Sequence, residues 1–371
     1  MGRLRKLPRD PERSAKIAGL RYIGDRIPGY TRGRRGKGFV YFDTEGKSLR
    51  DKNELTRIRS LVIPPAWTKI WICPDASGHL QAIGYDARGR KQYRYHSAYR
   101  NLRNQTKFDR MPEVVSGITT ARIRIQEHLT LPGMPREKVL AALIRLLDMT
   151  GIRIGNEVSA TENKTFGLTT LRNQHVEIEG ETLRFRFTGK SGVKHELEIT
   201  DRRISRIVRQ CHDLPGHQLF EYIDQNGELR SVSSTDVNSY LREVSGQSLT
   251  AKDFRTWAGT VECAVALRDL GEFASETEGK RNIVTAIKRA AQRLGNRAAT
   301  CRAYYVHPAV TEAYLAGDLV SVMKRAAAAE PESKTDSGED TLSPEERAVL
   351  KIVKGYRYDL EQCIAISGGA A

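Results

Sequence analysis

The spacing of apolar residues changes near residue 100, and this change limits the possible folds more than any other feature of the chain. From Phe39 to Tyr95, short apolar runs alternate with turn residues, as in residues 39–42, 61–63, 69–73 and 81–86. Such runs are typical of strands joined by hairpins. Beyond residue 100, apolar residues recur with the period of a helix. The pattern predicts an α+β protein with a small β-rich N-terminal domain followed by a mainly α-helical domain.

Three helices are predicted both by the periodicity of their apolar residues and by residues that typically begin or end a helix. Pro135 opens a stretch with one apolar face, and Gly151 closes it. Residues 275–278 (Ser-Glu-Thr-Glu) fit a capping box before an apolar stripe that Gly295 ends. A final helix is expected to begin at Ser343 and Pro344 and to end near Gly355.

One segment within the helical part alternates instead. Between residues 175 and 199 the apolar residues that face one way are Val176, Ile178, Leu183, Phe185 and Phe187. Gly180 and residues 189–192 provide the turns. The alternation predicts a small antiparallel sheet inside the helical domain.

One basic run and one acidic run of charges stand out along the chain. Residues 3–37 are strongly basic, and four glycines lie between residues 29 and 38, so we expect a loosely turned basic arm. Residues 330–341 are acidic and low in complexity, which indicates a flexible linker. The predicted division is therefore 1–105 for the basic arm and β-rich N-terminal domain, 106–329 for the mainly helical domain, and 330–371 for the acidic linker and C-terminal helix.

The charge of the whole chain indicates the kind of partner. The 371 residues carry a formal net charge of +16, with a pI of about 9.7. Such a balance favours a polyanion, and the alternative is a merely basic surface. The five cysteines are dispersed, so neither a zinc site nor a disulfide framework is expected, and we predict a reducing compartment and no cofactor. No apolar run approaches the roughly 20 residues of a membrane helix, and the basic N-terminus does not show the apolar stretch expected of a signal peptide.

Five residues in separate contexts have the side chains that metal-free transesterification of a phosphodiester requires. They are Arg153, Lys190, Arg255, Asn296 and Tyr305. Arginine forks suit non-bridging phosphate oxygens, a lysine can donate a proton to a leaving oxygen, and a phenol near cations can attack phosphorus. Each residue alone is weak evidence, because a lone arginine or tyrosine is usually a surface or core residue.

The motifs around these residues resemble those of type IB DNA topoisomerases of the small poxvirus and bacterial kind. The resemblance extends from about residue 60 to residue 310. Its motifs are residues 88–95 (Arg-Gly-Arg-Lys-Gln-Tyr-Arg-Tyr), 152–155 (Ile-Arg-Ile-Gly), 162–171, 187–190 (Phe-Thr-Gly-Lys) and 252–256 (Lys-Asp-Phe-Arg-Thr). A protein of this family is expected to relax supercoiled DNA without ATP or metal, through a 3′-phosphotyrosyl intermediate.

The resemblance also implies roles for individual residues. Tyr305 would attack phosphorus, Lys190 would protonate the departing 5′ oxygen, and Arg153, Arg255 and Asn296 would hold the phosphate oxygens. The residues expected to contact DNA are Arg90, Lys91, Tyr93, Tyr95 and Lys252. For the two tyrosines the alternative is a strand end whose alternate side chains are buried. By the same resemblance, residues 1–105 would hold the N-terminal DNA-binding domain and residues 106–329 the catalytic domain, and the two are expected to form a clamp around duplex DNA.

Some positions depart from the poxvirus pattern or leave a choice. Asn296 stands where poxvirus enzymes have histidine, and residues 297–299 (Arg-Ala-Ala) differ from the usual Thr-Pro-Ala. Of the adjacent Tyr304 and Tyr305, we choose Tyr305 because it lies nine residues after Asn296 and directly before residues 306–308 (Val-His-Pro). The histidines that we predict to be structural are His96, His195 and His307.

Two other classes of protein share some of these features. A tyrosine recombinase or integrase uses the same chemistry, but it usually has His-x-x-Arg where this chain has Lys252 and Arg255, and Leu-Gly-His where this chain has Leu-Gly-Asn at residues 294–296. A non-catalytic DNA-binding protein is the second alternative. We expect double-stranded DNA as the partner, no membrane, a monomer, and a cytoplasmic, nucleoid-associated location.

Overall fold

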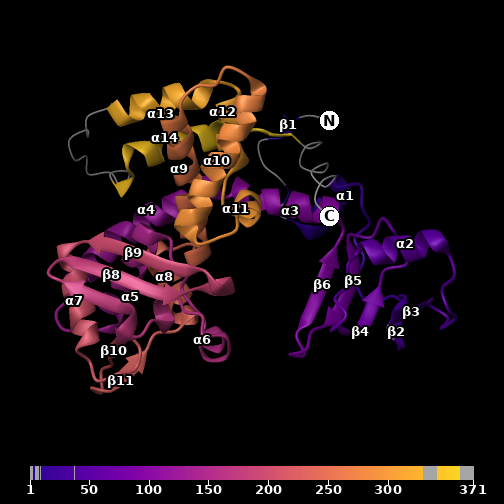
Figure 1. The fold of residues 1–371 in the computed structure, drawn as a ribbon, viewed down its shortest axis with the longest axis horizontal. Coiled ribbons are helices and arrows are strands. Elements are labelled where there is room, and N and C mark those ends of the chain that lie inside the picture. Colours follow the sequence, from indigo (N-terminus) through magenta and orange to yellow (C-terminus); the bar gives the residue numbers. More distant parts are fainter. Residues whose placement is uncertain (1–2, 5–7, 9, 37, 329–340, 360–371) are drawn as a thin grey trace. The chain divides into compact units, whose positions relative to one another are not determined.

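The chain folds into two compact units. The computed structural model describes residues 3–4, 8, 10–36, 38–328 and 341–359. The first unit comprises residues 1–109 with 357–371, and the second comprises residues 110–356 (Figure 1). The final helix thus belongs to the second unit. The predicted boundaries at residues 105 and 329 stay a prediction.

The first unit is built mainly from short antiparallel strands. Strands β2 and β3 form a hairpin, β4, β5 and β6 form a three-stranded sheet in that order, and β1 pairs with β12. Its elements are β1 (Arg3–Leu4), α1 (Pro11–Ile17), β2 (Thr31–Arg35), β3 (Gly38–Phe42), α2 (Lys52–Ser60), β4 (Thr68–Ile72), β5 (Leu80–Tyr85), β6 (Lys91–Tyr95), α3 (Ser97–Asp109) and β12 (Tyr358–Asp359). The predicted β-rich N-terminal region is confirmed.

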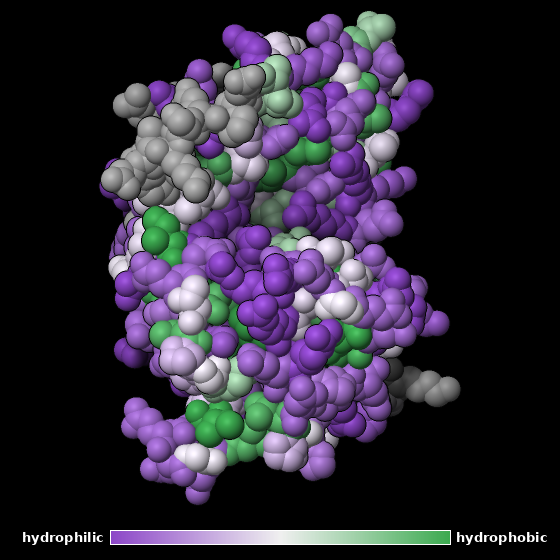
Figure 2. Space-filling view, turned by 90° about the vertical axis from the view of Figure 1, so that its left-hand side faces the viewer, coloured by the Kyte–Doolittle hydropathy of each residue, from purple (hydrophilic) through white to green (hydrophobic). Residues whose placement is uncertain are grey.

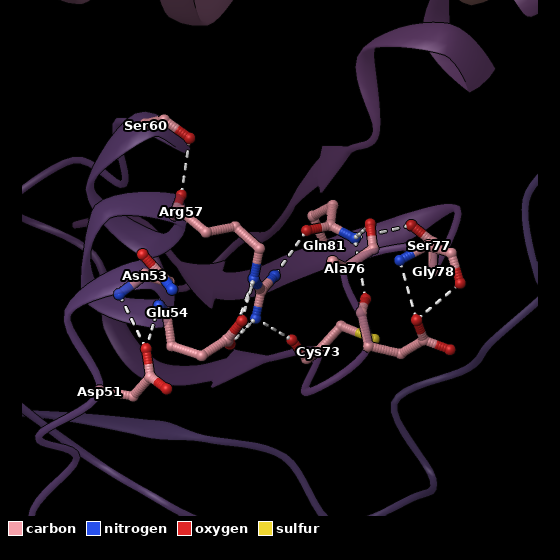
Figure 3. Close-up of polar contacts among 11 residues, drawn as sticks. Asp51, Asn53, Glu54, Arg57, Ser60, Cys73, Ala76, Ser77, Gly78 and Gln81 are labelled. Carbon is pink, nitrogen blue, oxygen red and sulfur yellow. Dashed lines mark hydrogen bonds and ion pairs between the residues drawn. The ribbon is translucent and has the colours of Figure 1, made fainter.

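Arg57 joins α2 to the three-stranded sheet (Figure 3). Its guanidinium donates to the Gln81 side-chain oxygen on β5 (2.7 Å) and to the Cys73 carbonyl just after β4 (2.8 Å). Glu54, one turn earlier on α2, pairs with the same guanidinium at 2.7 Å. Beneath this helix Ile58, Ile70, Ile72 and Ala82 form a small apolar core. The polar and apolar contacts together fix α2 on the sheet.

Two expectations for the first unit are wrong. The basic arm is not loose throughout, because residues 11–17 form α1 and residues 31–35 form β2. The Arg32 guanidinium donates to the carbonyls of Ile63 (3.1 Å) and Trp67 (2.7 Å), so this basic residue supports the fold. The apolar run at residues 61–63 is not a strand; it follows α2, whose C-cap is Leu61.

The second unit is mainly helical, with one three-stranded sheet and one short hairpin (Figure 1). The combination confirms the predicted α+β class. Its helices are α4 (Met111–His128), α5 (Arg136–Thr150), α6 (Glu157–Asn163), α7 (Arg202–His212), α8 (Ser234–Ser245), α9 (Ala251–Leu270), α10 (Glu276–Leu294), α11 (Ala298–Tyr304), α12 (Pro308–Leu315), α13 (Asp318–Ala328) and α14 (Pro344–Gly355), with the 3-10 turns η1 (Leu168–Thr170), η2 (Asn173–His175) and η3 (Lys190–Gly192). Its strands are β7 (Val176–Glu179), β8 (Thr182–Thr188), β9 (Lys194–Thr200), β10 (Glu221–Ile223) and β11 (Leu229–Ser231).

The predicted sheet within the helical part is confirmed as β7, β8 and β9, which pair antiparallel in that order. Leu183 and Phe185 of β8 are fully buried, as the alternation predicts. On the other face, Arg184 pairs with glutamates of both neighbouring strands, and so does Arg186.

Figure 2 shows the side of the molecule that lies on the left in Figure 1, and hydrophilic residues cover most of it.

The helix ends follow the expected signals with one difference. Pro135 and Gly151 flank α5, and Ser343 caps α14 in a full capping box. At the start of α10, Ser275 accepts from the Glu278 N–H, but the Glu278 carboxylate accepts from the N–H of Ala274, one residue earlier than the box requires. The predicted linker falls almost entirely on residues 330–340, which lie outside the described residues. Over the described parts of the chain, no helix combines the length and apolar character needed to cross a membrane.

Candidate active site

Arg153 lies in the turn that follows α5. Gly151 ends that helix with a φ of 68°, in the left-handed region that favours glycine. The Leu168 N–H then donates to the Arg153 carbonyl (2.9 Å), and the Thr169 N–H donates to the Ile154 carbonyl (2.6 Å). The backbone of Arg153 is thereby held by η1, and its side chain extends from a fixed support.

Arg255 extends from α9 into the same place. The residue is only 4% exposed. Its guanidinium donates to two backbone carbonyls, those of Gly151 and Leu294, the latter at 2.9 Å. A third contact reaches the Asn296 side-chain oxygen at 3.5 Å. The two arginines are 102 positions apart in sequence, yet their guanidinium groups share the carbonyl-lined end of α5 and α10.

Asn296 lies between the two guanidinium groups. It follows Gly295, which ends α10 with a φ of 58°, and its own N–H donates to the Ala291 carbonyl (2.8 Å). The Asn296 Oδ1 accepts from both Arg153 and Arg255, while Arg153 also donates to the Gly295 carbonyl (2.9 Å). The Asn296 Nδ2 is buried and has no hydrogen-bond partner among the described residues. The amide therefore keeps an unused donor at the site.

Tyr305 is placed beside Arg255 by contacts from α9. The Thr260 hydroxyl accepts from the His307 N–H (3.1 Å), and its one proton is within reach of the Thr256 carbonyl (2.8 Å) and the Tyr305 carbonyl (3.3 Å). Gly259 allows this approach, because a Cβ there would lie 2.7 Å from the Tyr305 carbonyl oxygen. The Arg255 guanidinium carbon lies 5.4 Å from the centre of the Tyr305 ring. The structure thus brings together four of the five predicted catalytic residues.

Among the residues that the structure describes, no carboxylate neutralises the charge of this group. Neither Arg153 nor Arg255 forms an ion pair with any carboxylate of the described residues; their partners are carbonyl and amide oxygens. Burial lowers the pKa of both guanidinium groups, and the charge of Arg153 lowers the pKa of Arg255 further. Arginine nevertheless stays protonated in proteins. Two adjacent positive charges remain available for an anion.

Lys190 is the predicted catalytic residue that the structure does not place against the others. It begins η3, at the tip between β8 and β9, and its side chain is exposed. The tip includes Ser191 and Gly192, both with positive φ. Within the described parts of the chain, Lys190 forms no hydrogen bond or ion pair. Its role as the general acid stays a prediction.

His195 lies at the edge of the site, which the sequence reasoning missed. Its ring stacks on Phe187 with centroids 4.7 Å apart, and it fills the space where a side chain on Gly295 would lie. Burial lowers the pKa of His195, and the charges of Arg153 and Arg255 lower it further. His195 follows Lys190 by five residues on the same hairpin, and this position was the signal available in the sequence.

The other two histidines accept local hydrogen bonds. The Nδ1 of His96 accepts from the Ala98 N–H (3.2 Å), and the Nδ1 of His307 accepts from the Ala309 N–H (3.0 Å). Among the described residues, no group of three or more His, Cys, Asp or Glu side chains is placed to hold a metal ion.

Comparisons with known proteins identify the family to which this site belongs. The family model of the eukaryotic DNA topoisomerase I catalytic core matches residues 96–319, and that of the bacterial DNA topoisomerase IB N-terminal domain matches residues 38–86. DNA topoisomerase 1B of Acanthamoeba polyphaga mimivirus is 30% identical over 343 residues, which cover 90% of this chain and 97% of the relative. The chain belongs to the type IB DNA topoisomerase family.

More distant relatives match parts of the chain. DNA topoisomerase 1B of vaccinia virus (strain Copenhagen) is 31% identical over 128 residues, 34% of this chain and 40% of the relative. DNA topoisomerase 1 of Mycosarcoma maydis is 24% identical over 193 residues, 46% of this chain and 19% of the relative. The comparisons confirm the predicted family and enzyme class, and they give no support to the recombinase alternative.

The residues predicted to contact DNA are on the surface of this type IB family member. Tyr93 and Tyr95 of β6 are 45% and 40% exposed, and their rings stack with centroids 5.9 Å apart. The Lys91 ammonium pairs with Asp25 at 2.5 Å, and Arg90 pairs with Asp86. Lys252 is exposed near the start of α9. The strand alternates with both tyrosines outward, but contact with DNA stays a prediction.

Proposed function

We propose that this protein relaxes supercoiled duplex DNA by cutting and resealing one strand through a covalent bond to Tyr305. The observation that carries the proposal is the pair of guanidinium groups beside that phenol, which have no carboxylate partner among the described residues. As a phosphodiester approaches the transition state of the reaction, negative charge builds up on its non-bridging oxygens. Arg153 and Arg255 provide two fixed cations for that charge, and Asn296 Nδ2 provides a neutral donor.

The proposed reaction exchanges one ester bond for another. The Tyr305 hydroxyl oxygen attacks phosphorus and its proton passes to solvent, while the bond from phosphorus to the 5′ oxygen breaks. Lys190 gives a proton to that oxygen, so a 5′ hydroxyl leaves and the 3′ phosphate stays joined to Tyr305. Religation is the reverse of these steps. Because the ester bond is conserved in the intermediate, no ATP is needed.

The support from the site lies in its rigidity. Backbone carbonyls and an amide hold both guanidinium groups before any DNA arrives, so little free energy is lost in ordering them during reaction. Lys190 differs because its side chain is exposed and unpaired within the described residues. We infer that the β8–β9 tip brings Lys190 to the leaving oxygen only when DNA is bound.

Contact with duplex DNA is proposed for both units. In the first unit it would involve Arg90, Lys91, Tyr93 and Tyr95, and in the second unit Lys252, in keeping with the net charge of +16. Closure of the two units as a clamp stays a prediction. We also propose that the protein acts as a monomer and that its DNA substrate sets a nucleoid-associated location.

Plasmid relaxation tests the proposed function. Purified protein is incubated with negatively supercoiled plasmid in EDTA without ATP, and topoisomers are separated on agarose. We expect a ladder of relaxed topoisomers from the wild-type protein and none from Tyr305→Phe. Plasmid that is bound and retarded but stays fully supercoiled would instead support a non-catalytic DNA-binding protein.

A further inference from the structure

Helix α14 lies outside the part of the chain that matches the catalytic core, yet it packs on the helices of the active site. The match ends at residue 319, and α14 begins at Pro344. In the structure α14 contacts α4, α9, α12 and α13 (Figure 1). Because α9 carries Arg255 and α12 begins three residues after Tyr305, α14 is in a position to influence both.

Glu346, in the first turn of α14, makes the central contact. Its side chain is 12% exposed. It accepts from the Trp257 indole N–H (2.7 Å) and from both terminal nitrogens of Arg122 (2.8 Å each). Arg122 in turn pairs with Asp148 of α5 at 2.8 Å. One buried carboxylate therefore joins α14 to α9 and, through Arg122, to α4 and α5.

The contact with Trp257 lies close to the catalytic group. Trp257 is 1% exposed and follows Arg255 by two residues on α9. One turn further along the same helix, Thr260 holds the backbone of Tyr305 and His307. A rotation or shift of α9 would displace the Arg255 guanidinium from its carbonyl partners. The hydrogen bond from Trp257 to Glu346 opposes such a movement because the indole is a rigid side chain with a directional donor.

The C-terminal end of α14 makes a second contact with the segment that follows Tyr305. The Tyr356 ring lies edge-on to His307 with centroids 5.4 Å apart, and the Tyr356 hydroxyl donates to Glu312 of α12 at 2.6 Å. The two ends of α14 thus contact the two parts of the chain that carry Arg255 and Tyr305.

We propose that Glu346 is a positioning residue for Arg255, acting through Trp257, and that α14 is required for strand cleavage although it lies outside the matched core. The inference rests on the proposed function. Loss of the Glu346 carboxylate lets α9 shift, so the arginine no longer fits the phosphate oxygens in the transition state. Initial DNA binding, which depends on many phosphate contacts, is left largely intact.

The test is single-turnover cleavage of a suicide duplex at saturating protein, with Glu346→Ala compared with Glu345→Ala. Glu345 is the matched control, since it occupies the same helical turn but pairs with Arg268 (3.2 Å) and not with Trp257. We expect Glu346→Ala to slow covalent capture roughly tenfold, the size of one lost charge-assisted hydrogen bond. Glu345→Ala should change the rate by about twofold at most. The DNA dissociation constant should be the same for both variants.

A double-mutant cycle separates positioning from general support of the fold. In an Arg255→Ala background, Glu346→Ala should slow cleavage by about twofold at most, because its effect passes through the missing guanidinium. Persistence of the full tenfold factor would overturn the proposal. If Glu346→Ala does not fold, Trp257→Phe takes its place; it removes the N–H donor, keeps a buried ring, and should slow capture several-fold.

The two proposals fail in different ways. If the wild-type protein forms no covalent complex, the proposed function is wrong. If the wild-type protein cleaves and Glu346→Ala cleaves as fast as Glu345→Ala, only the role of α14 is wrong.

Discussion

Two arginine sites in the second unit, Arg122 and the pair of Arg153 and Arg255, are at least partly buried but differ in the partners of their guanidinium groups. Arg122 contacts two carboxylates, Asp148 and Glu346, each at 2.8 Å. Arg153 and Arg255 contact carbonyl and amide oxygens and, among the described residues, no carboxylate. Burying a charge without a countercharge costs free energy. A folded protein tolerates that cost where an anion is to be bound, so the difference in partners separates a structural arginine from the two that we propose to be catalytic.

The pKa shifts of the two sites express the same difference. Burial by itself would lower the pKa of Arg122, but its hydrogen bonds and ion pairs with Glu346 and Asp148 outweigh burial and raise it. For Arg153 and Arg255 burial is the main cause, and the pKa is lowered. The protein thus stabilises the charged form of Arg122 with its own carboxylates. At Arg153 and Arg255 the stabilising countercharge would come from a bound anion.

The largest expected effect is on stability. Arg122→Ala leaves two buried carboxylates without their cation and should reduce the free energy of unfolding by roughly 3–5 kcal/mol. Urea denaturation measures it. Arg124→Ala is the control, since Arg124 is on the same helix and its pair with Glu127 is exposed, so its change should stay within about 1 kcal/mol. Equal losses in the two variants would contradict the structural role of Arg122.

In contrast to Arg122→Ala, Arg255→Ala should slow cleavage strongly and change stability only a little. Removing a fixed phosphate-oxygen donor should raise the cleavage barrier by roughly 3–4 kcal/mol, or about 10² to 10³ in rate. The midpoint of urea unfolding should change far less than for Arg122→Ala, because Arg255 has no ion pair with any carboxylate in the described parts of the chain. Single-turnover covalent capture and denaturation of the same samples check both parts. A variant that unfolds easily but cleaves at the wild-type rate would reverse the two assignments.

Lys190 provides a third case, a cation that is exposed and unpaired within the described parts of the chain. Lys190→Ala should slow cleavage roughly 10²-fold through loss of the general acid, without changing stability. A substrate with a 5′-bridging sulfur, which departs without a proton, should restore most of the rate. Absence of rescue would show that Lys190 does not protonate the leaving group.

The smallest expected effect is the response of the folded protein to a simple anion. If the Arg153 and Arg255 site lacks only its anion, inorganic phosphate at a few times its dissociation constant should stabilise the protein by about 1 kcal/mol. Thermal unfolding with and without phosphate measures the shift. Arg255→Ala is the control for general salt effects, and an equal shift in both proteins would place the binding elsewhere.

The residues of the Arg153 and Arg255 site could be predicted from the sequence, but those of the Arg122 site could not. The motifs around Arg153, Arg255 and Asn296, with the spacing to Tyr305, identified residues that the structure brings together. Periodicity and end signals predicted α5, α14 and the β7–β9 sheet, because these depend on neighbours close in sequence.

The Arg122 site depends on ion pairs between residues that are far apart in the chain. Arg122 meets Asp148 across 26 positions and Glu346 across 224, and no local pattern distinguishes Arg122 from the other 60 Lys and Arg residues. The same reason explains the errors in the basic arm, where Arg32 donates to carbonyls more than 30 positions away. His195 was missed beside the site because its contact with Gly295 spans 100 positions.

Identification of the residue that becomes joined to DNA tests the central claim most directly. A suicide duplex is trapped with the protein, the complex is digested with protease, and the DNA-linked peptide is sequenced by mass spectrometry. We predict attachment at Tyr305, with capture abolished in Tyr305→Phe and retained in Tyr304→Phe. Attachment at Tyr304 or at any other residue would contradict the assignment of Tyr305 to the phosphate site formed by Arg153 and Arg255.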